Sequence, residues 1–144
     1  FVLNKVHSVN PDTKKYFEIY NKYYVWDLGI RNCLVWFNLS NDIWKLLENY
    51  MFLILKKHWY DIKIWRLKND REIDFIAEKF WKVKYFQVST TILDDNTRQR
   101  EYSPFFEIKD NWEKYVVSFD DNNFWEKDGI KHINIMDIED VFLN

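Results

Sequence analysis

The most informative stretch for the architecture is residues 61–90, DIKIWRLKNDREIDFIAEKFWKVKYFQVST. Apolar residues in this stretch alternate with a period of two, which is typical of half-buried β-strands. The turn-forming residues 68–71 interrupt the alternation. We therefore expect three consecutive strands, at Asp61–Leu67, Glu72–Ala77 and Lys82–Thr90.

A helical pattern precedes these strands. Ser40, Asn41 and Asp42 favour a helix N-cap, and apolar residues then recur at helical spacing to about His58. Further along, we expect a helix capped by Asp94 or Asp95 and running to about Ile108, strands at Lys114–Phe119 and Ile130–Ile135, and a closing helix at Asp137–Leu143. The order α-β-β-β-α-β, followed by β-α, predicts an α/β fold with a mixed central sheet.

The first 38 residues predict a small β-rich segment. Phe1–Val6 and Tyr16–Tyr20 are β-prone, and the turn signal Asn10-Pro11-Asp12 lies between them. Tyr23–Trp26 is a further extended run, and Asp27 can cap a short helix after it. We expect a hairpin followed by a short connection.

The composition excludes several function classes. The 144 residues include two glycines, Gly29 and Gly129, so neither G-x-x-x-x-G-K-[ST] nor G-x-G-x-x-G is present. The longest strictly apolar run, Tyr50–Leu55, is too short to cross a bilayer, and no signal peptide pattern is present. Cys33 stands alone in an apolar stretch, which favours a reducing compartment and a buried side chain. We expect a cytoplasmic protein that does not contact membranes.

Charge is distributed unevenly along the chain. The formal net charge is −2, but residues 1–72 carry twelve Lys or Arg against eight Asp or Glu. A nucleic-acid-binding role would therefore belong to the first half. The candidate contacts are Lys5, Lys14, Lys15 and Lys22. The alternative is ordinary solvated faces, since no run of five like charges occurs.

The order α-β-β-β-α-β resembles that of the PD-(D/E)xK nucleases, which have a restriction-endonuclease-like fold. The resemblance implies an acid on the first helix, an Asp on the second strand and an acid-x-Lys string on the third. Carboxylates would hold Mg²⁺, and the Lys would stabilise charge on the phosphate. In this sequence the corresponding places hold Glu48, Asp74 and the string Gln87-Val88-Ser89.

The candidate catalytic residues are therefore Glu48, Asp74 and Gln87, and Asp74 and Glu48 would bind Mg²⁺ if the site is active. Gln87 is neutral where an acid is usual, Ser89 stands where Lys is usual, and strand alternation turns Lys84 to the opposite face. As alternatives, Glu48 lies on a solvated helix face, and Asp74 is either a retained structural or vestigial residue or a plainly solvated one. Asp74 and Glu72 would repel each other unless a cation, a donor or water lies between them.

Several strings resemble a more specific family. Residues 22–32, KYYVWDLGIRN, are similar to a K-Y-Y-x-x-D-x-G-x-R-N signature. The strings Leu46-Leu47-Glu48-Asn49, Glu72-Ile73-Asp74-Phe75, Gln87-Val88-Ser89 and Thr97-Arg98-Gln99-Arg100-Glu101 follow in the family's order. The family is the C-terminal domain of unknown function that is appended to prokaryotic AAA+-type ATPases.

This resemblance implies two segments. Residues 1–38 would be the end of a winged-helix-like segment and its connection, and residues 39–144 a degenerate PD-(D/E)xK nuclease-like domain. ATP would bind only to a domain that precedes this chain, which itself would hold no cofactor. Asp27, Gly29, Arg31 and Asn32 would form a structural turn in which Gly29 supplies a φ angle that other residues resist.

Three functions follow as hypotheses. The first is a non-catalytic or regulatory module of an attached or associated ATPase, which mediates interaction with nucleic acid, possibly DNA, or with protein. The second is a Mg²⁺-dependent DNA nuclease whose Lys has moved to another position. The third is an oligomerisation domain that forms a homo-oligomer, suggested by an aromatic content of 20%.

Overall fold

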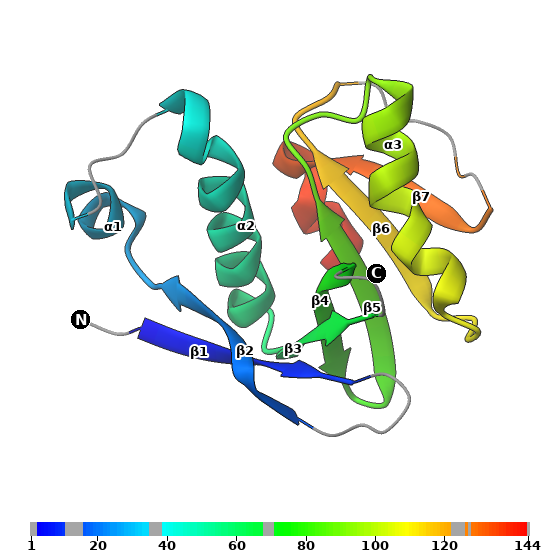
Figure 1. The fold of residues 1–144 in the computed structure, drawn as a ribbon, viewed down its shortest axis with the longest axis horizontal. Helices are drawn as coiled ribbons and strands as arrows, with labels where there is room; N and C mark the ends of the chain where they lie inside the picture. The colour runs from blue at the N-terminus through cyan, green and yellow to red at the C-terminus, as the bar shows by residue number, and fades with distance from the viewer. Residues whose placement is uncertain are drawn as a thin grey trace.

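The computed structural model describes residues 3–10, 16–34, 39–67, 71–121, 126 and 128–143 (Figure 1). Its α/β fold contains the predicted α-β-β-β-α-β order. The elements are β1 (Leu3–Val9), β2 (Tyr16–Val25), α1 (Leu28–Leu34), α2 (Leu39–Lys57), β3 (Asp61–Arg66), β4 (Glu72–Lys79), β5 (Lys82–Val88), α3 (Asp95–Tyr102), the 3₁₀ helix η1 (Ser103–Glu107), β6 (Glu113–Ser118), β7 (Ile130–Asn134) and the 3₁₀ helix η2 (Ile135–Phe142).

The described strands form a seven-stranded mixed sheet in the order β2-β1-β3-β4-β5-β6-β7. The pairs β1–β2, β3–β4 and β4–β5 are antiparallel, whereas β1–β3, β5–β6 and β6–β7 are parallel. Because Ser8 pairs with Ile64 and Val9 with Trp65, the N-terminal hairpin joins the same sheet as the later strands. The sheet therefore extends across the expected boundary at residue 38, and that boundary stays a prediction.

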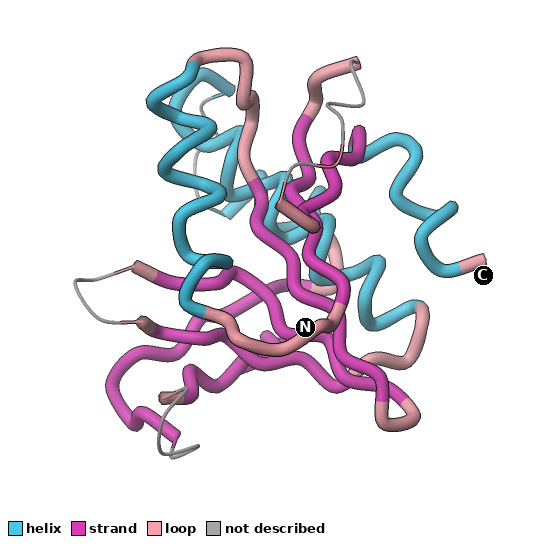
Figure 2. Tube along the Cα trace, turned by 90° about the vertical axis from the view of Figure 1, so that its right-hand side faces the viewer, coloured by secondary structure: helices cyan, strands magenta, loops and turns pink. Residues whose placement is uncertain are grey.

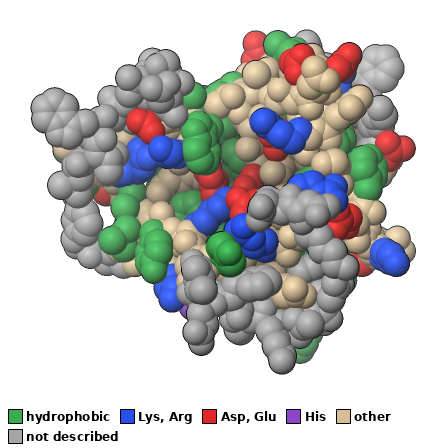
Figure 3. Space-filling model, in the orientation of Figure 1, with side chains coloured by type: hydrophobic (Ala, Val, Ile, Leu, Met, Phe, Trp, Pro, Cys, Tyr) green, Lys and Arg blue, Asp and Glu red, His purple; other side chains and the backbone are tan. Residues whose placement is uncertain are grey.

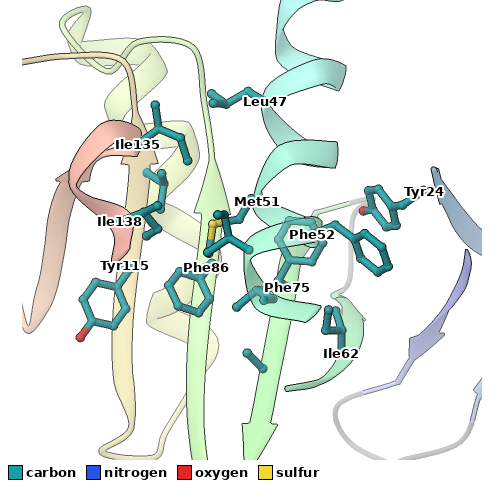
Figure 4. Close-up of a cluster of buried hydrophobic side chains, with 14 of the residues drawn as sticks. Tyr24, Leu47, Met51, Phe52, Ile62, Phe75, Phe86, Tyr115, Ile135 and Ile138 are labelled. Atoms are coloured by element: carbon teal, nitrogen blue, oxygen red, sulfur yellow. The ribbon is translucent and has the colours of Figure 1, made fainter. Parts of the chain in front are cut away.

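Helices cover both faces of the sheet, and Figure 2 shows helical segments flanking the strands. On one face α2 and η2 pack against the sheet, and Figure 4 shows Met51 and Phe52 of α2 beside Phe75 and Phe86. On the other face, Tyr102 and Phe105 at the end of α3 and in η1 belong to a second core cluster. The apolar stripe of α2 was the sequence signal for the first of these layers.

A β-bulge interrupts β4 next to β3. Lys63 pairs with Ile76 but Trp65 pairs with Ile73, so β4 has one residue more than β3 between these pairs. Consequently Ile73 packs in the second core cluster and Phe75 in the first. On a regular strand, residues two positions apart would lie on the same face. The extra residue falls at Asp74–Phe75, and bulges of this kind redirect side chains.

Several expected boundaries differ from those observed. Residues 16–25 form one strand rather than two, and α2 begins at Leu39, so that residues 40–42 lie inside its first turn. Asp94 is the N-cap of α3, as predicted, and accepts from Thr97 N at 2.8 Å. The helix ends at Tyr102 rather than near Ile108, because Pro104 lacks the N–H that an α-helix needs there. The closing segment is a 3₁₀ helix from Ile135.

The segment around α1 confirms one prediction and corrects two. Asp27 Oδ1 accepts from Ile30 N at 2.9 Å, which is the predicted cap. Gly29 does not have the expected unusual φ; a Cβ there would lie 3.1 Å from Asp27 Oδ1, so this glycine allows a close approach. Cys33 is exposed, not buried, because the described part of α1 contributes no residue to either core cluster.

No helix within the described ranges is both long enough and apolar enough to span a membrane.

Candidate functional site

Four charged side chains from three elements meet beside α2. The ammonium Nζ of Lys22 on β2 lies 2.6 Å from Glu72 Oε1, 2.9 Å from Glu48 Oε1 and 3.0 Å from Asp74 Oδ1. Glu48 comes from α2, and Glu72 and Asp74 come from β4. We call these four residues the lysine–carboxylate centre. It contains Glu48 and Asp74, two of the predicted site residues. The repulsion expected between Glu72 and Asp74 is offset by a cation, the ammonium of Lys22.

Strand alternation in β2 directs Lys22 and Tyr24 to the centre and leaves Tyr23 60% exposed. The hydroxyl of Tyr24 donates to Glu48 Oε1 at 2.5 Å. The ring of Tyr24 stacks on Phe52 of α2, with ring centroids 4.6 Å apart. Tyr24 thus anchors β2 to the apolar face of α2 and fixes the carboxylate of Glu48.

Asn49 ties the end of β2 to α2. Its Oδ1 accepts from Val25 N at 2.9 Å, and its Nδ2 donates to Val25 O at 2.8 Å. One side chain therefore satisfies both backbone groups of Val25, as a neighbouring strand would. Glu48 and Asn49 are both buried, so the alternative that placed Glu48 on a solvated helix face is wrong.

Asp74 is the most constrained carboxylate of the centre. Its Oδ2 accepts from Val88 N at 3.0 Å, while its Oδ1 faces Lys22. Burial raises the pKa of Asp74 to about 7; Lys22 opposes the rise, and the charge of Glu48 adds to it. Burial is the largest cause because it disfavours the charged form; Glu72 adds a smaller rise, and the hydrogen bond from Val88 N lowers the pKa.

Burial on its own would lower the pKa of Lys22. The charges of Asp74, Glu48 and Glu72 outweigh burial and raise the pKa of Lys22 well above its ordinary value. Burial, with the charge of Glu48, also raises the pKa of the Tyr24 hydroxyl. Lys22 is therefore charged and Tyr24 is neutral around neutral pH.

Gln87 lies beside the centre and connects it to α3. Its Oε1 accepts from Asp74 N at 3.3 Å, and its Nε2 donates to Glu101 Oε2 at 3.1 Å. Arg100 contacts the other oxygen of Glu101 at 2.7 Å. An amide fits this position because it accepts on one side and donates on the other, which a carboxylate cannot do.

The residues that stand where a nuclease lysine is usual do not supply one. Ser89 Oγ donates to Thr91 O at 2.9 Å. Lys84 pairs with Glu113. The cation near Asp74 comes from β2 instead, on a segment that precedes the nuclease-like order.

The centre as arranged does not fit Mg²⁺. Carboxylate oxygens are suitable ligands for this ion. However, the three carboxylates converge on an ammonium, whose charge repels a divalent cation from the same position. Within the part of the chain that the structure describes, no group of three or more His, Cys, Asp or Glu residues is arranged to hold a metal ion.

The four lysines predicted to contact nucleic acid do not lie together on one described surface. Lys5 is exposed on β1, whereas Lys22 is engaged by carboxylates. Lys14 and Lys15 lie outside the described residues. Figure 3 shows acidic and basic side chains next to one another near the middle of the face in view.

Sequence reasoning missed the roles of Lys22, Tyr24 and Glu101. Lys22 was interpreted as a phosphate contact because it lies in the basic half of the chain. The signal that could have corrected this is the string Lys22-Tyr23-Tyr24, in which alternation places the Lys and the second Tyr on one side of a strand.

Comparison with known proteins shows a similarity to a bacterial protein. The chain is 30% identical over 137 residues to an uncharacterized protein of Haemophilus influenzae, a match that covers 95% of this chain and 33% of that protein. The chain thus spans about a third of the length of the relative. No protein-family model matches the chain, and no solved structure matches it. The lysine–carboxylate centre is therefore the feature from which a function has to be inferred.

Proposed function

We propose that this chain is a non-catalytic or regulatory module of a prokaryotic AAA+-type ATPase, to which it is attached or with which it associates. Its nuclease-like centre holds the ammonium of Lys22 in place of a divalent cation. The module mediates interaction with nucleic acid or protein. The observation that supports this proposal is the contact of Lys22 Nζ with three carboxylates at 2.6–3.0 Å.

The chemistry of an ammonium explains why the centre would not catalyse hydrolysis. Metal-dependent phosphodiester hydrolysis needs a cation that polarises the phosphate and lowers the pKa of a bound water. An ammonium has one charge and no open coordination position. In this centre its charge is offset by Glu48, Glu72 and Asp74, so it joins β2, α2 and β4 rather than facing a substrate.

The link to an ATPase rests on the family resemblance of residues 22–32 and the strings that follow. The H. influenzae relative supports a modular arrangement, because the matched region is 33% of that protein. The ATP-binding part would lie outside this chain, which has two glycines and no phosphate loop.

Calorimetric titration with MnCl₂ tests the proposal. The wild-type chain should give no binding heat up to millimolar Mn²⁺ and no Mg²⁺- or Mn²⁺-dependent cleavage of DNA. Lys22→Met leaves three carboxylates without a cation, so this variant should bind Mn²⁺ and gain thermal stability from it. Lys22→Arg keeps the charge and should behave as wild type, and Lys5→Met controls for loss of an exposed Lys. Metal-dependent cleavage by wild type that disappears in Asp74→Ala would contradict the proposal.

One observation favours the second candidate, a Mg²⁺-dependent nuclease with a relocated lysine. Lys22 Nζ lies 3.0 Å from Asp74 Oδ1, and Asp74 occupies the place of the motif Asp. In that case cleavage should require both residues, and both Lys22→Met and Asp74→Ala should abolish it. Unchanged DNA in the wild-type reaction excludes this candidate.

A further inference from the structure

Three large aromatic side chains protrude from the protein surface. Trp59 is 85% exposed, Phe80 83% and Trp81 96%. Their φ angles are 63°, 46° and 68°, in the left-handed region that L-residues with bulky side chains rarely adopt. Each ring is thus held at a strained position and gains almost no burial in return.

Trp59 follows the C-terminal end of α2. Trp59 N donates to Lys56 O at 3.0 Å, and Tyr60 N donates to Leu55 O at 3.1 Å. These paired hydrogen bonds form a Schellman motif, in which the residue at the position of Trp59 is usually Gly. The local preference for Gly is overridden by a Trp.

Phe80 and Trp81 are the two central residues of the turn between β4 and β5, which Lys79 and Lys82 flank as a cross-strand pair. Positive φ at both central residues is the geometry of a type I′ turn, for which Asn-Gly is preferred. Two aromatic residues therefore occupy the tip of a hairpin that Asn and Gly would close with less strain.

The two turns lie side by side. Lys79 Nζ donates to His58 O at 2.8 Å and lies 5.5 Å from the ring centroids of Tyr60 and Phe80. Figure 1 shows α2 ending on the same lower side of the molecule at which β4 and β5 join. Trp59, Phe80 and Trp81 thus form one surface, which we call the aromatic tip.

Basic residues surround the aromatic tip. Lys82 is exposed beside Trp81, and Lys57, 63% exposed, precedes Trp59 by two residues. Lys57 also contacts Glu139 at 2.6 Å, so part of its charge is offset. Lys79 adds a third ammonium between the turns. Asp61 and Glu78, at the adjoining strand ends, both contact Lys63. Lys57, Lys79 and Lys82 therefore leave this surface with an excess of positive charge.

Exposed aromatic rings next to lysines suit one kind of ligand. Unpaired bases stack on aromatic side chains whatever their sequence, and the adjoining phosphates attract Lys. A duplex hides its base faces, and a second copy of the chain would bring lysine against lysine. Strain held at exposed positions indicates a functional constraint.

We propose that the aromatic tip binds single-stranded nucleic acid, with bases stacked on Trp59, Phe80 and Trp81 and phosphates near Lys57 and Lys82. This goes beyond the proposed function, because it names a partner and a surface that shares no residue with the lysine–carboxylate centre. Mn²⁺ binding tests the centre and oligonucleotide binding tests the tip, so either proposal can fail alone.

Tryptophan fluorescence titration of the 144-residue chain with a 20-nucleotide oligo-dT tests the proposal. The combined variant Trp59→Gly, Phe80→Asn and Trp81→Gly has residues suited to these φ angles, and a thermal melt checks its fold. We expect its affinity for oligo-dT, followed by anisotropy of a labelled oligonucleotide, to fall at least about tenfold. Lys82→Glu should weaken binding and flatten its salt dependence by about 0.7 in the log–log slope.

Trp44→Ala is the matched control. Trp44 is 49% exposed on α2, the helix that Trp59 follows. It lies about 20 Å from the C-terminal end of α2, because a helix rises 1.5 Å per residue. This variant should keep the wild-type affinity. A folded combined variant that binds oligo-dT as tightly as wild type would overturn the proposal. So would a preference for duplex DNA, binding to anionic phospholipid vesicles but not to oligo-dT, or a dimer that only the combined variant loses.

Discussion

Lys22 Nζ and Asp74 Oδ1 lie 3.0 Å apart, although 52 residues separate them in the chain and two strands separate β2 from β4 in the sheet. Strands in a flat sheet lie about 4.8 Å apart, so a lysine could not reach across three such spacings. The contact is possible because the described pairing of β1 with β3 is confined to Ser8 and Val9. The rest of the hairpin does not pair with β3 and lies against α2, where Asn49 and Tyr24 hold it.

The pKa of Asp74 predicts a pH dependence of stability. Because burial raises this pKa from 3.8 to about 7, the folded chain keeps a proton on Asp74 that the unfolded chain has already lost. The stabilising contribution is complete below about pH 4 and is lost as the pH rises to about 7, with a slope of at most about 1.4 kcal/mol per pH unit. Urea unfolding of wild type and Asp74→Asn from pH 4 to 8 measures the difference.

The Asp74→Asn curve should lack this slope, so the difference in stability between wild type and the variant should change between pH 4 and pH 7. Asp61→Asn is the control, because the side chain of Asp61 is 68% exposed. An Asp74→Asn curve parallel to that of wild type would contradict the assignment of the raised pKa to Asp74.

Asn49→Ala should destabilise the protein by about 1 to 2 kcal/mol, because the N–H and C=O of half-buried Val25 would lose these side-chain partners. Asn49→Asp is the matched variant, since a carboxylate can accept from Val25 N but cannot donate to Val25 O. The buried carboxylate would face Val25 O, so the free energy of unfolding of this variant should be no higher than that of Asn49→Ala. Equal stability of all three chains would show that Asn49 does not hold β2 to α2.

Gln87→Glu restores the acid that the nuclease string usually has at this position. The new carboxylate would face Glu101, and Glu101 Oε2 would lose the Nε2 donor that now lies 3.1 Å away. We therefore expect the free energy of unfolding to fall by about 2 kcal/mol or more. Gln99→Glu, at an exposed position of α3, should stay close to wild type. Thermal unfolding at pH 7 compares the two. A stable Gln87→Glu chain that cleaves DNA with Mg²⁺ would also contradict the proposed function.

At positions with positive φ, replacing Gly should lower the free energy of unfolding, and introducing Gly should raise it. Gly129 has φ +75° and open space where a Cβ would lie, so Gly129→Ala should cost about 1 kcal/mol through backbone strain. Trp81→Gly relieves the same kind of strain and should increase the free energy of unfolding by a similar amount. Chemical denaturation of both variants measures this. Destabilisation by Trp81→Gly would mean that the exposed ring supports the fold.

The part of the fold with strong periodicity was predictable from the sequence. The alternation in residues 61–90 and the apolar stripe before it define α2 and β3 to β5. The cap predicted at Asp27 is confirmed, and of the pair Asp94 and Asp95 the cap is Asp94. The cap predicted at residues 40–42 is wrong, because α2 begins at Leu39. The end of α3 was predicted too late, since the helical pattern was followed past Pro104.

The candidate site was predictable only in part. Glu48, Asp74 and Gln87 come together because they lie on adjoining elements of the predicted order. Lys22 could not be placed there, because its position depends on how far β1 pairs with β3 and on the hydrogen bonds of Asn49. Nor does periodicity reveal the bulge at Asp74, which is a matter of strand register.

The hairpin of β1 and β2 brings the positive charge of Lys22 to the carboxylates on α2 and β4. A chain divided after residue 38 would separate Lys22 from Glu48, Glu72 and Asp74 and leave three neighbouring carboxylates with no counter-ion from β2. Such carboxylates repel one another and oppose the packing of α2 on β4. The smallest unit with a balanced interior therefore includes β2, whatever the division by sequence resemblance suggests.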